Sequence, residues 1–327
     1  ESPYKPLLNK PVSGVYAPGS TLKMIAAIAA QENGIAPTHR THCTGRVWYG
    51  NRYFHCWKRG GHGTLDMKGA IKNSCNIFFY DVAKTLDIDI LAETARKFGL
   101  GQTYELGVSG QQRGVIPDRA WKRQYFAGNP ENQSWFQGET LSCIVGQGYV
   151  TATPLQLAVM AGRLATGRAV RPRLVRAVGD LVLPAPEVPP IDVDQEHLRV
   201  VQDGMNAVTN EFGTAARSRL DDPEWQLAGK TGTSQVYQIT AEDRARGLAE
   251  PEDLPWGRRD HALFVCYMPY ENPRYACSVV VEHGIGGSRA AGPKAREIMR
   301  AVAEKDPSAR QPLDPRTLAR ASAPQQG

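Results

Sequence analysis

Apolar residues recur with a helical period in several separate segments of the chain. The first segment, residues 21–33, is rich in alanine, isoleucine and methionine; Pro18-Gly19-Ser20 precedes it, and Gly34 can cap its end. The same periodicity predicts further helices at residues 67–73, 76–86, 90–98, 155–166, 194–209 and 293–304. We therefore expect a chain rich in helices, with its first long helix starting directly after Ser20.

Three runs of residues in the C-terminal third have the composition of β-strands. They cover residues 226–236, 262–268 and 275–282, and the proline-flanked segment 269–273 predicts a hairpin turn between the last two. Residues 237–259 are polar and charged, which predicts a long loop beside the strand that carries Lys230. Residues 184–190 form a proline-rich linker, and the Pro-, Ala- and Arg-rich residues 306–327 predict a disordered C-terminal tail.

The composition is that of an ordinary globular protein. With 327 residues, of which 41% are hydrophobic and 22% charged, the chain can bury a full core as one large or two modest domains. The formal net charge is +6, but the basic residues are scattered, which argues against nucleic-acid binding. No run of about 18 apolar residues and no signal-peptide pattern occurs, so this segment is predicted neither to span a membrane nor to export itself.

Three short motifs, in a fixed order, carry the candidate chemistry. The first is Ser20-Thr21-Leu22-Lys23, the second Ser74-Cys75-Asn76 and the third Lys230-Thr231-Gly232-Thr233. A serine and a lysine three residues apart on a helix lie on one face, so the amine can reach the hydroxyl whose proton must leave. Together the motifs predict a serine that transfers acyl groups.

Each motif also has a plainer interpretation when it is taken alone. Ser20 could be only the N-cap of the first helix, and residues 230–233 could be a polar strand end. The glycines of Gly146-Gln147-Gly148 are interpreted as backbone turns that shape a cleft wall. The order of the three motifs favours catalysis over these separate structural roles.

The motifs resemble those of the penicillin-binding transpeptidase family of serine acyltransferases, over residues 6–304. The flanking residues 14–20, 146–149 and 151–154 are similar to the class B branch, in particular to its penicillin-binding protein 2 group of the rod-elongation machinery. The resemblance implies an α+β fold, shared with serine β-lactamases, in which an antiparallel sheet of five strands is packed between helices beside an all-helical subdomain. It implies a transpeptidase domain at residues 1–305, with the first strands and the membrane anchor of the parent protein absent from this chain.

The resemblance also implies a role for each motif residue. Ser20 attacks the bond between the two terminal D-alanines of a peptidoglycan stem peptide, and Lys23 is the general base, with a pKa lowered by burial and by Lys230. Ser74 relays the proton, and Asn76 orients Lys23 and the substrate. The residues implied in binding the substrate carboxylate and in the oxyanion hole are Lys230, Thr231, Gly232 and Thr233, with the N–H groups of Ser20 and Thr233 as oxyanion donors.

The implied function is D,D-transpeptidation in the periplasm by a protein anchored in the inner membrane. The implied substrates are stem peptides, the inhibitors are β-lactams, and the partners are a glycosyltransferase and other proteins of the elongation complex. A D,D-carboxypeptidase and a non-catalytic β-lactam-sensing domain remain alternatives. A class A β-lactamase is disfavoured, because the chain lacks a matching E-x-x-x-N segment.

Six cysteines raise a separate question, because disulfides are the default in an oxidising periplasm. Residues 35–66 show no clear periodicity and are interpreted as a loop-rich insertion; Cys43, Cys56, His62 and Cys75 gather around it. Three thiolates and one imidazole suit a closed tetrahedral zinc site, which would brace the loop that holds Ser74 and Asn76. His42 or His55 could replace a ligand, and a disulfide with a free thiol is the alternative.

The other three cysteines, Cys143, Cys266 and Cys277, lie in apolar surroundings and are expected to be packed thiols. Cys266 and Cys277 flank the predicted hairpin turn and could pair across it.

Overall fold

An antiparallel sheet of three strands lies at the centre of the computed structural model, which describes residues 5–237, 239–247 and 249–308. Its strands are β7 (Ala228–Ser234), β8 (His261–Met268) and β9 (Tyr275–Val281), in the order β7-β8-β9. The three strands and the turn that joins the last two were predicted from composition. The resemblance implied five strands, and the described part of the chain supplies three.

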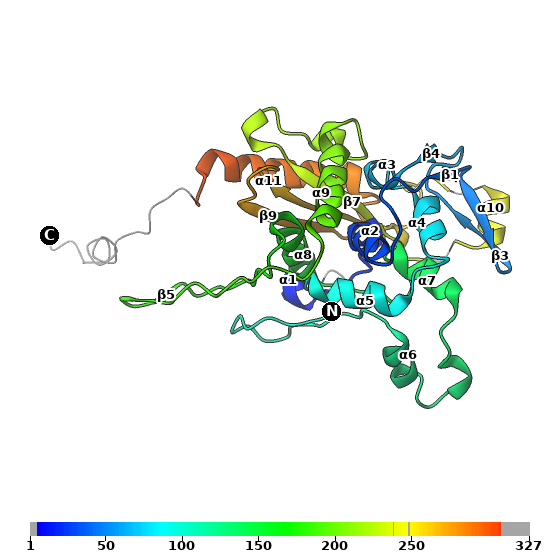
Figure 1. The fold of residues 1–327 in the computed structure, drawn as a ribbon, viewed down its shortest axis with the longest axis horizontal. Helices are drawn as coiled ribbons and strands as arrows, with labels where there is room; N and C mark the ends of the chain where they lie inside the picture. The colour runs from blue at the N-terminus through cyan, green and yellow to red at the C-terminus, as the bar shows by residue number, and fades with distance from the viewer. Residues whose placement is uncertain (1–4, 238, 248, 309–327) are drawn as a thin grey trace.

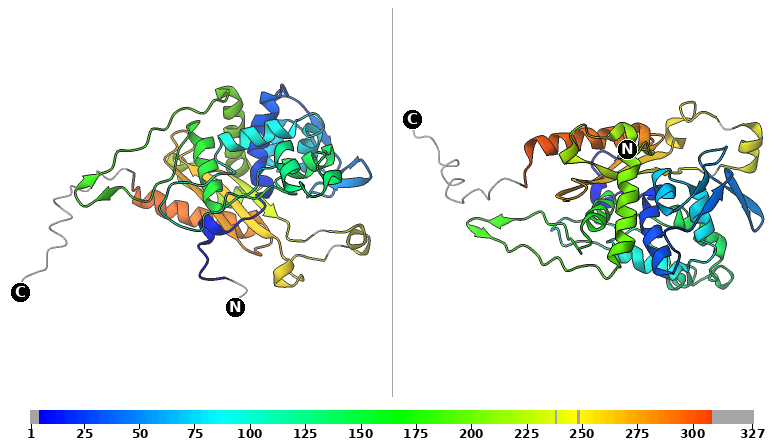
Figure 2. Two further views of the ribbon diagram at one scale, coloured as in Figure 1. Left: turned by 90° about the horizontal axis from the view of Figure 1, so that it is seen from below. Right: turned by 45° about the horizontal axis from the view of Figure 1, so that its top comes forward.

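Helices cover the sheet, as Figures 1 and 2 show. Helices α8 (Pro154–Thr166) and α11 (Gly292–Lys305) both pack against β8 and β9, and α9 (Gln195–Asn210) packs against β7. Strand β8 is buried along nearly its whole length, which explains its almost unbroken apolar sequence. This arrangement fixes β7, the strand with the third motif, at one edge of the described sheet.

The helical part of the molecule is built around α2 (Lys23–Glu32), whose residues 23–31 are all buried. Around it lie α3 (Met67–Lys72), α4 (Asn76–Val82) and α5 (Ile88–Lys97), which were predicted with slightly different ends. Helix α5 begins two residues early because the Asp87 side chain caps it by accepting from the Asp89 N–H. Helices α6 (Arg119–Tyr125) and α7 (Gln137–Ile144) were not predicted, since they are short and mostly polar.

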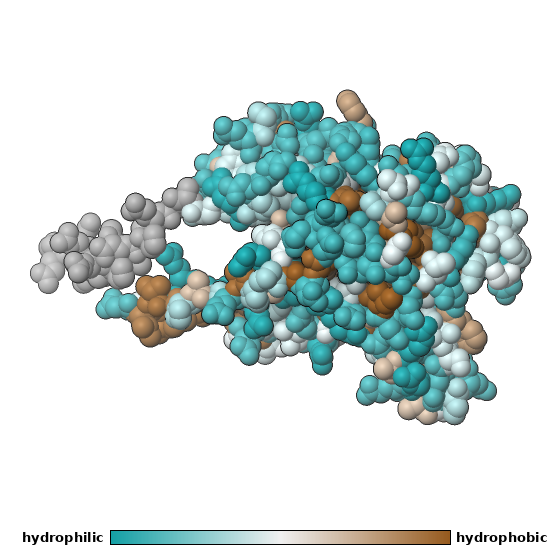
Figure 3. All heavy atoms as spheres, viewed as in Figure 1, coloured by the Kyte–Doolittle hydropathy of each residue, from teal (hydrophilic) through white to brown (hydrophobic). Residues whose placement is uncertain are grey.

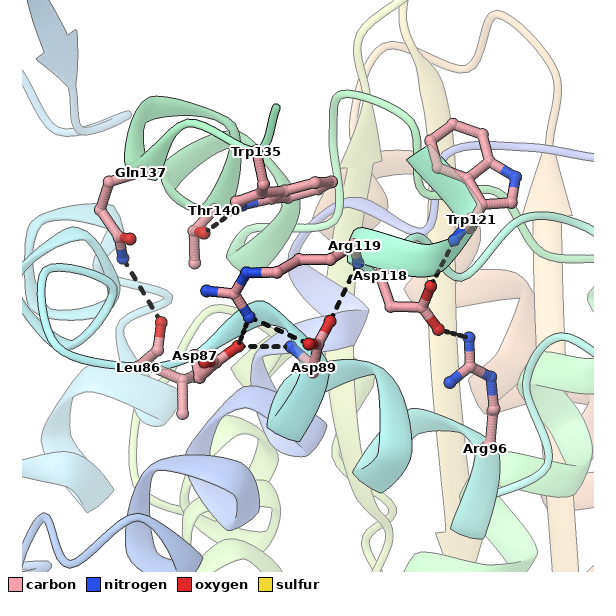
Figure 4. Close-up of polar contacts among 10 residues, drawn as sticks. All are labelled: Leu86, Asp87, Asp89, Arg96, Asp118, Arg119, Trp121, Trp135, Gln137 and Thr140. Atoms are coloured by element: carbon pink, nitrogen blue, oxygen red, sulfur yellow. Dashed lines mark hydrogen bonds and ion pairs between the residues drawn. The ribbon is translucent and has the colours of Figure 1, made fainter. Parts of the chain in front are cut away.

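Exposed ion pairs join α5 to α6 (Figure 4). Arg119 Nη1 binds both Asp87 and Asp89, and Arg96 Nη2 lies 2.6 Å from Asp118 Oδ2. Asp118 also caps α6 by accepting from the Trp121 N–H. Surface pairs of this kind contribute about 0–1 kcal/mol each, so the apolar core must supply most of the stability here.

Residues 35–66, interpreted from the sequence as a loop-rich insertion, contain four short strands among their turns. The segment forms β1 (Thr41–Cys43), β2 (Arg46–Tyr49), β3 (Arg52–His55) and β4 (Gly63–Leu65), in which β1 pairs with β4 and β2 pairs with β3. Strands of three or four residues are too short to give a clear period, which is why the sequence concealed them. A turn at Gly50, with φ of 62°, joins β2 to β3.

A narrow arm projects from the body and carries β5 (Ala177–Val178) and β6 (Leu181–Val182). Its tip is apolar and exposed, and it is the brown group at the end of the arm in Figure 3. The remaining elements are α1 (Lys10–Ser13), η1 (Gly19–Leu22), η2 (Pro130–Asn132), η3 (Ala216–Ser218), η4 (Pro223–Trp225), α10 (Ala241–Arg246), η5 (Trp256–Arg258) and η6 (Gly287–Ala291).

The structure describes most of the predicted loop 237–259 and the start of the predicted C-terminal tail. Within the predicted loop 237–259 the structure has the short helix α10. At the start of the predicted tail, Asp306 accepts a hydrogen bond from Tyr275 Oη at 2.7 Å, and residues 309–327 lie outside the described residues. Among the helices that the structure describes, none has the length and apolar character needed to cross a membrane.

Candidate active site

Ser20 lies in η1, the tight turn that leads into α2, and its side chain faces a large cleft. Gly19 makes this placement possible: it has φ of 54°, and a Cβ there would lie 2.2 Å from the Thr233 carbonyl oxygen. The Gly19 N–H donates to the Gly146 carbonyl at 2.9 Å. The nucleophile turn is therefore pressed between β7 and the predicted glycine turn at residue 146.

Lys23 is the first residue of α2 and is fully buried beneath the cleft. Its Nζ donates to Asn76 Oδ1 at 2.6 Å and to the Ser74 carbonyl at 2.8 Å, and it lies 3.3 Å from Ser74 Oγ. Burial lowers the pKa of Lys23 to about 8, and the nearby cysteines, Cys56 foremost, partly oppose this shift. A substantial fraction of this amine is therefore neutral at mildly alkaline pH.

Lys230, on β7, contacts Ser74 as well. Its Nζ donates to Ser74 Oγ and to the Thr231 carbonyl, both at 2.9 Å. Burial, and then repulsion from Lys23, hold the pKa of Lys230 well below its usual value. Ser74 Oγ thus bridges two buried amines. Because both amines are buried and close together, it is unfavourable for both to be protonated at once.

The turn between α3 and α4 aims the second motif at the cleft. Ser74 has φ of 53°, a left-handed conformation that is unfavourable for a serine. The turn is held because the Cys75 N–H donates to the Ala70 carbonyl at 2.9 Å and Asn76 Nδ2 donates to the His55 carbonyl at 3.0 Å. Ser74 and Asn76 line the cleft, while the intervening Cys75 is buried.

The third motif runs along β7 on the other side of the cleft. A Cβ on Gly232 would lie 2.8 Å from Thr21 Cγ2, so this position must be glycine for the strand to pack on the nucleophile turn. Thr231 Oγ1 lies 2.8 Å from Thr214 Oγ1, and the Thr233 carbonyl accepts from Gln147 Nε2 at 3.1 Å.

The cleft has a volume of about 1890 Å³. The motif residues that line it are Ser20, Ser74, Asn76, Thr231, Gly232 and Thr233, with Lys23 and Lys230 buried below. The lining residues that sequence reasoning missed include Thr214 and Gln147. Gln147 could have been found, because it lies between the two glycines that were predicted to shape a cleft wall. Thr214 belongs to no motif that the sequence analysis identified.

A compact cluster of four metal-ligating side chains lies behind the Ser74–Asn76 turn. The ligand atoms of Cys43, Cys56, His62 and Cys75 all lie within 4.8 Å of one another. His62 Nδ1 is 3.6 Å from Cys43 Sγ and 3.5 Å from Cys56 Sγ. The four residues predicted from spacing therefore do come together, and none of the three cysteines forms a disulfide.

The two alternative histidines stand outside this cluster. His42 Nδ1 instead lies 3.0 Å from Thr64 Oγ1. Within the cluster, a hydrogen bond from Cys75 lowers the pKa of the Cys56 thiol, and the backbone N–H of Asn76 adds to the effect. That N–H donates to Cys56 Sγ at 3.4 Å, so the cluster contacts the catalytic turn directly.

The remaining cysteines are also free thiols. Cys143 and Cys266 are fully buried, as expected of packed thiols, and Cys277 is partly exposed. Cys266 and Cys277 lie directly opposite each other in the β8–β9 register.

Comparison with known proteins identifies the family of this chain. Residues 1–302 match the family model described as the penicillin binding protein transpeptidase domain. The chain belongs to the penicillin-binding protein transpeptidase family. This confirms the predicted α+β fold, with an antiparallel sheet between helices and a helical part beside it.

Three members of the family illustrate the similarity. The chain is 33% identical over 304 residues to the peptidoglycan D,D-transpeptidase MrdA of Haemophilus influenzae, covering 90% of this chain and 45% of that relative. It is similar to Pseudomonas aeruginosa PBP2 in complex with WCK 5153, with 35% identity, a TM-score of 0.79 and coverage of 92% and 64% of the two chains.

A complex between PBP2 and MreC from Helicobacter pylori also matches, with 31% identity, a TM-score of 0.79 and coverage of 92% and 52%. The chain thus spans less than half the length of the curated penicillin-binding protein relative from Haemophilus influenzae.

Proposed function

We propose that this chain is the D,D-transpeptidase domain of a cell-elongation enzyme, which forms an acyl-enzyme on Ser20 and cross-links peptidoglycan stem peptides. The observation that carries the proposal is the bridge of Ser74 Oγ between the buried amines of Lys23 and Lys230, at a cleft that Ser20 also lines. The names of the similar transpeptidases support the same reaction.

Acylation requires an amine to take the Ser20 proton. The Ser20 oxygen bonds to the carbonyl carbon of the penultimate D-alanine, and its proton passes to neutral Lys23. The carbon–nitrogen bond then breaks, and the released D-alanine nitrogen receives a proton through Ser74, which contacts both lysines. Backbone N–H groups of Ser20 and Thr233 stabilise the oxyanion, and Lys230, Thr231 and Thr233 hold the substrate carboxylate.

Deacylation reverses these steps with a different amine. The amine of a neighbouring stem peptide attacks the ester carbonyl, the carbon–oxygen bond to Ser20 breaks, and the proton lost by the amine returns to the Ser20 oxygen. Asn76 holds Lys23 in place during both steps, through the 2.6 Å hydrogen bond to its amine. Water as the acceptor would give the carboxypeptidase reaction with the same residues.

We expect a labelled penicillin to modify the protein stably and in a ratio of one to one, and the Ser20→Ala variant to lose all labelling, because the acyl bond forms on the Ser20 oxygen. Intact-protein mass spectrometry measures both. A wild-type chain that takes up no label would contradict the proposal. Formation of cross-linked dimers from stem peptides then distinguishes a transpeptidase from a carboxypeptidase or a sensing domain.

We expect the rate of acylation to rise as the pH increases through about 8, the value to which burial lowers the pKa of Lys23. The general base must be neutral, so protonation below this pH removes the reactive form. The measurement is the second-order rate constant for penicillin acylation between roughly pH 6 and pH 10. A flat profile across this range would argue against Lys23 as the base.

We infer that the four-residue cluster binds a structural zinc ion through Cys43, Cys56, His62 and Cys75. Zinc–sulfur and zinc–nitrogen bonds of about 2.3 and 2.0–2.1 Å at a tetrahedral angle separate the two ligand atoms by about 3.6 Å. The separations of 3.6 and 3.5 Å between His62 Nδ1 and two sulfur atoms match this value. Four protein ligands leave no open position, so the ion would brace the Ser74–Asn76 turn and supply no reaction chemistry.

The names of solved relatives support the partners that we propose. The complex of PBP2 with MreC supports an elongation-complex partner of the MreC type, and a glycosyltransferase partner remains a proposal. We propose that this domain works in the periplasm and that the parent protein is anchored in the inner membrane. β-Lactams are the proposed inhibitors, because they acylate the same serine.

A further inference from the structure

The cleft around Ser20 continues well beyond the catalytic residues, along the β2–β3 hairpin. Its volume of about 1890 Å³ exceeds the roughly 300–1,000 Å³ of an ordinary small-molecule pocket. Residues of β2, β3 and the segment just after them line it, together with residues of β7 and residues 235–237, 239 and 240. In both views of Figure 2 the hairpin and the chain that follows β7 extend to the same end of the molecule. The cleft therefore has room for an extended peptide beyond the scissile bond.

The pairing of β2 with β3 places four cleft-lining side chains together on one face of the hairpin. Arg46 lies opposite His55 and Trp48 lies opposite Tyr53, and all four line the cleft. Because side chains alternate along a strand, the other face carries Val47, Tyr49, Arg52 and the buried Phe54, and of these Arg52 and Phe54 also line the cleft. We call the first set, Arg46, Trp48, Tyr53 and His55, the hairpin wall.

The hairpin wall presents exposed aromatic rings beside a fixed cation. Trp48 and Tyr53 are 55% and 47% exposed, and their ring centroids lie 4.9 Å apart. The Arg46 guanidinium lies 4.5 Å from the centre of the Tyr53 ring. Stacking on the ring limits the motion of the guanidinium and leaves its N–H edges available to a carboxylate. Exposed Trp, Tyr and Arg side chains together are the usual composition of a binding hot spot.

The charge of the cleft has one sign. Arg46, Arg52 and Arg59 line it, and no carboxylate side chain from the described part of the chain does so. None of these three guanidinium groups forms an ion pair with a described acidic residue, whereas arginines elsewhere, such as Arg96 and Arg119, are paired. Unpaired cations along a polar and aromatic cleft favour an anionic ligand.

We propose that the hairpin wall binds the acceptor strand, as an acidic peptide whose carboxylate pairs with Arg46 and whose apolar parts lie on Trp48 and Tyr53. The inference rests on the proposed function and adds the recognition of the second substrate. The proposed function places the carboxylate of the donor peptide at Lys230 and Thr231 on β7, so the donor occupies that side of the cleft. The hairpin belongs to the opposite side, because Asn76 Nδ2 donates to the His55 carbonyl at 3.0 Å.

The test measures transfer from the acyl-enzyme to an added amine. A small D-alanyl thioester acylates Ser20, and the acceptor is a peptide amine with free carboxylates or the same peptide with its carboxylates amidated. We expect Arg46→Gln to raise the concentration of acidic acceptor needed for half-maximal transfer about tenfold, the weight of one charge-assisted hydrogen bond. The variant is also expected to lose the wild-type preference for the acidic over the amidated acceptor, while penicillin acylation is unchanged.

Two further variants sharpen the result. Arg123→Gln changes an exposed arginine on α6, away from the cleft, and is expected to behave as wild type. Trp48→Ala removes the apolar surface and is expected to weaken both acceptors about equally. Thermal unfolding of each variant shows whether the hairpin still folds.

Unaltered acceptor dependence in Arg46→Gln, with normal penicillin labelling, would overturn this inference alone. The inference would also be overturned if Arg46→Gln slowed acylation of Ser20 by a peptide donor, because the hairpin wall would then bind the donor strand. Absence of penicillin labelling in the wild type would overturn the proposed function, and this inference with it.

Discussion

Replacing Lys23 by methionine is expected to slow the acylation of Ser20 by a factor of about a thousand or more. A positioned general base contributes roughly 10²–10⁴ in rate, and Lys23 is a fully buried amine whose pKa is lowered to about 8. Methionine fills a similar volume, so the core around α2 is kept. The measurement is the second-order rate constant for a fluorescent penicillin.

The same substitution leaves two buried acceptors, Asn76 Oδ1 and the Ser74 carbonyl, without their amine donor. Each unsatisfied group costs about 1–3 kcal/mol, partly offset because a buried charge is removed as well. Thermal unfolding therefore has to accompany the kinetics. Lys294→Met, an exposed lysine on α11, is the matched control and is expected to change neither quantity.

The Lys230→Met variant separates the two amines. Lys230 donates to Ser74 Oγ and to the Thr231 carbonyl, so its loss affects the proton relay and the binding of the substrate carboxylate. We expect it to retain the rise in rate with pH that depends on Lys23. If the rise disappears in Lys230→Met and survives in Lys23→Met, the assignment of the base is reversed.

The candidate catalytic residues could be proposed from the sequence because their spacing is local. Ser20 and Lys23 share one turn, and Ser74 and Asn76 flank a single residue, so the sequence itself defines each pair. Thr214 and Gln147 were not predicted as site residues, because only tertiary packing brings them to Thr231 and Thr233.

The elements of the fold that could be predicted are likewise those that local sequence determines. The long amphipathic helices and the central strands β7, β8 and β9 were predicted from periodicity and composition. The short strands β1–β4 were missed, since pairing across the chain, and not local propensity, stabilises segments of three or four residues. Spacing alone indicated the Cys/His cluster because its ligands occur within one short stretch, although the strands that align them were hidden.

The Cys75→Ser variant is expected to lose bound zinc and to unfold at a lower temperature. Cys75 is almost completely buried and lies with Cys43, Cys56 and His62 in a cluster whose ligand atoms are within 4.8 Å of one another. Zinc bound only to the folded state contributes its binding free energy to folding. A loss of about 3 kcal/mol would lower the Tm by roughly 5 °C, because the entropy of unfolding of about 300 residues is roughly 0.6 kcal/mol/K.

Cys143→Ser is the matched control, because Cys143 is equally buried and lies outside the cluster. It removes a packed thiol of the same volume and is expected to keep its zinc. Metal analysis should give about one zinc per chain for the wild type and for Cys143→Ser. A wild-type protein that contains no zinc and unfolds at the same temperature after treatment with a chelator would contradict the zinc site.

The loss of zinc should also disturb the position of Ser74 and Asn76 in the active site, because the backbone of Asn76 contacts the cluster. The Asn76 N–H donates to Cys56 Sγ, and Asn76 Oδ1 accepts from Lys23, so one residue contacts both the cluster and the general base. Ser74 holds a left-handed φ of 53° that the surrounding turn must maintain. We therefore expect Cys75→Ser to reduce the rate of penicillin acylation below the unfolding temperature, whereas Cys143→Ser retains it. Normal acylation in a zinc-free Cys75→Ser variant would show that the turn keeps its shape without the metal.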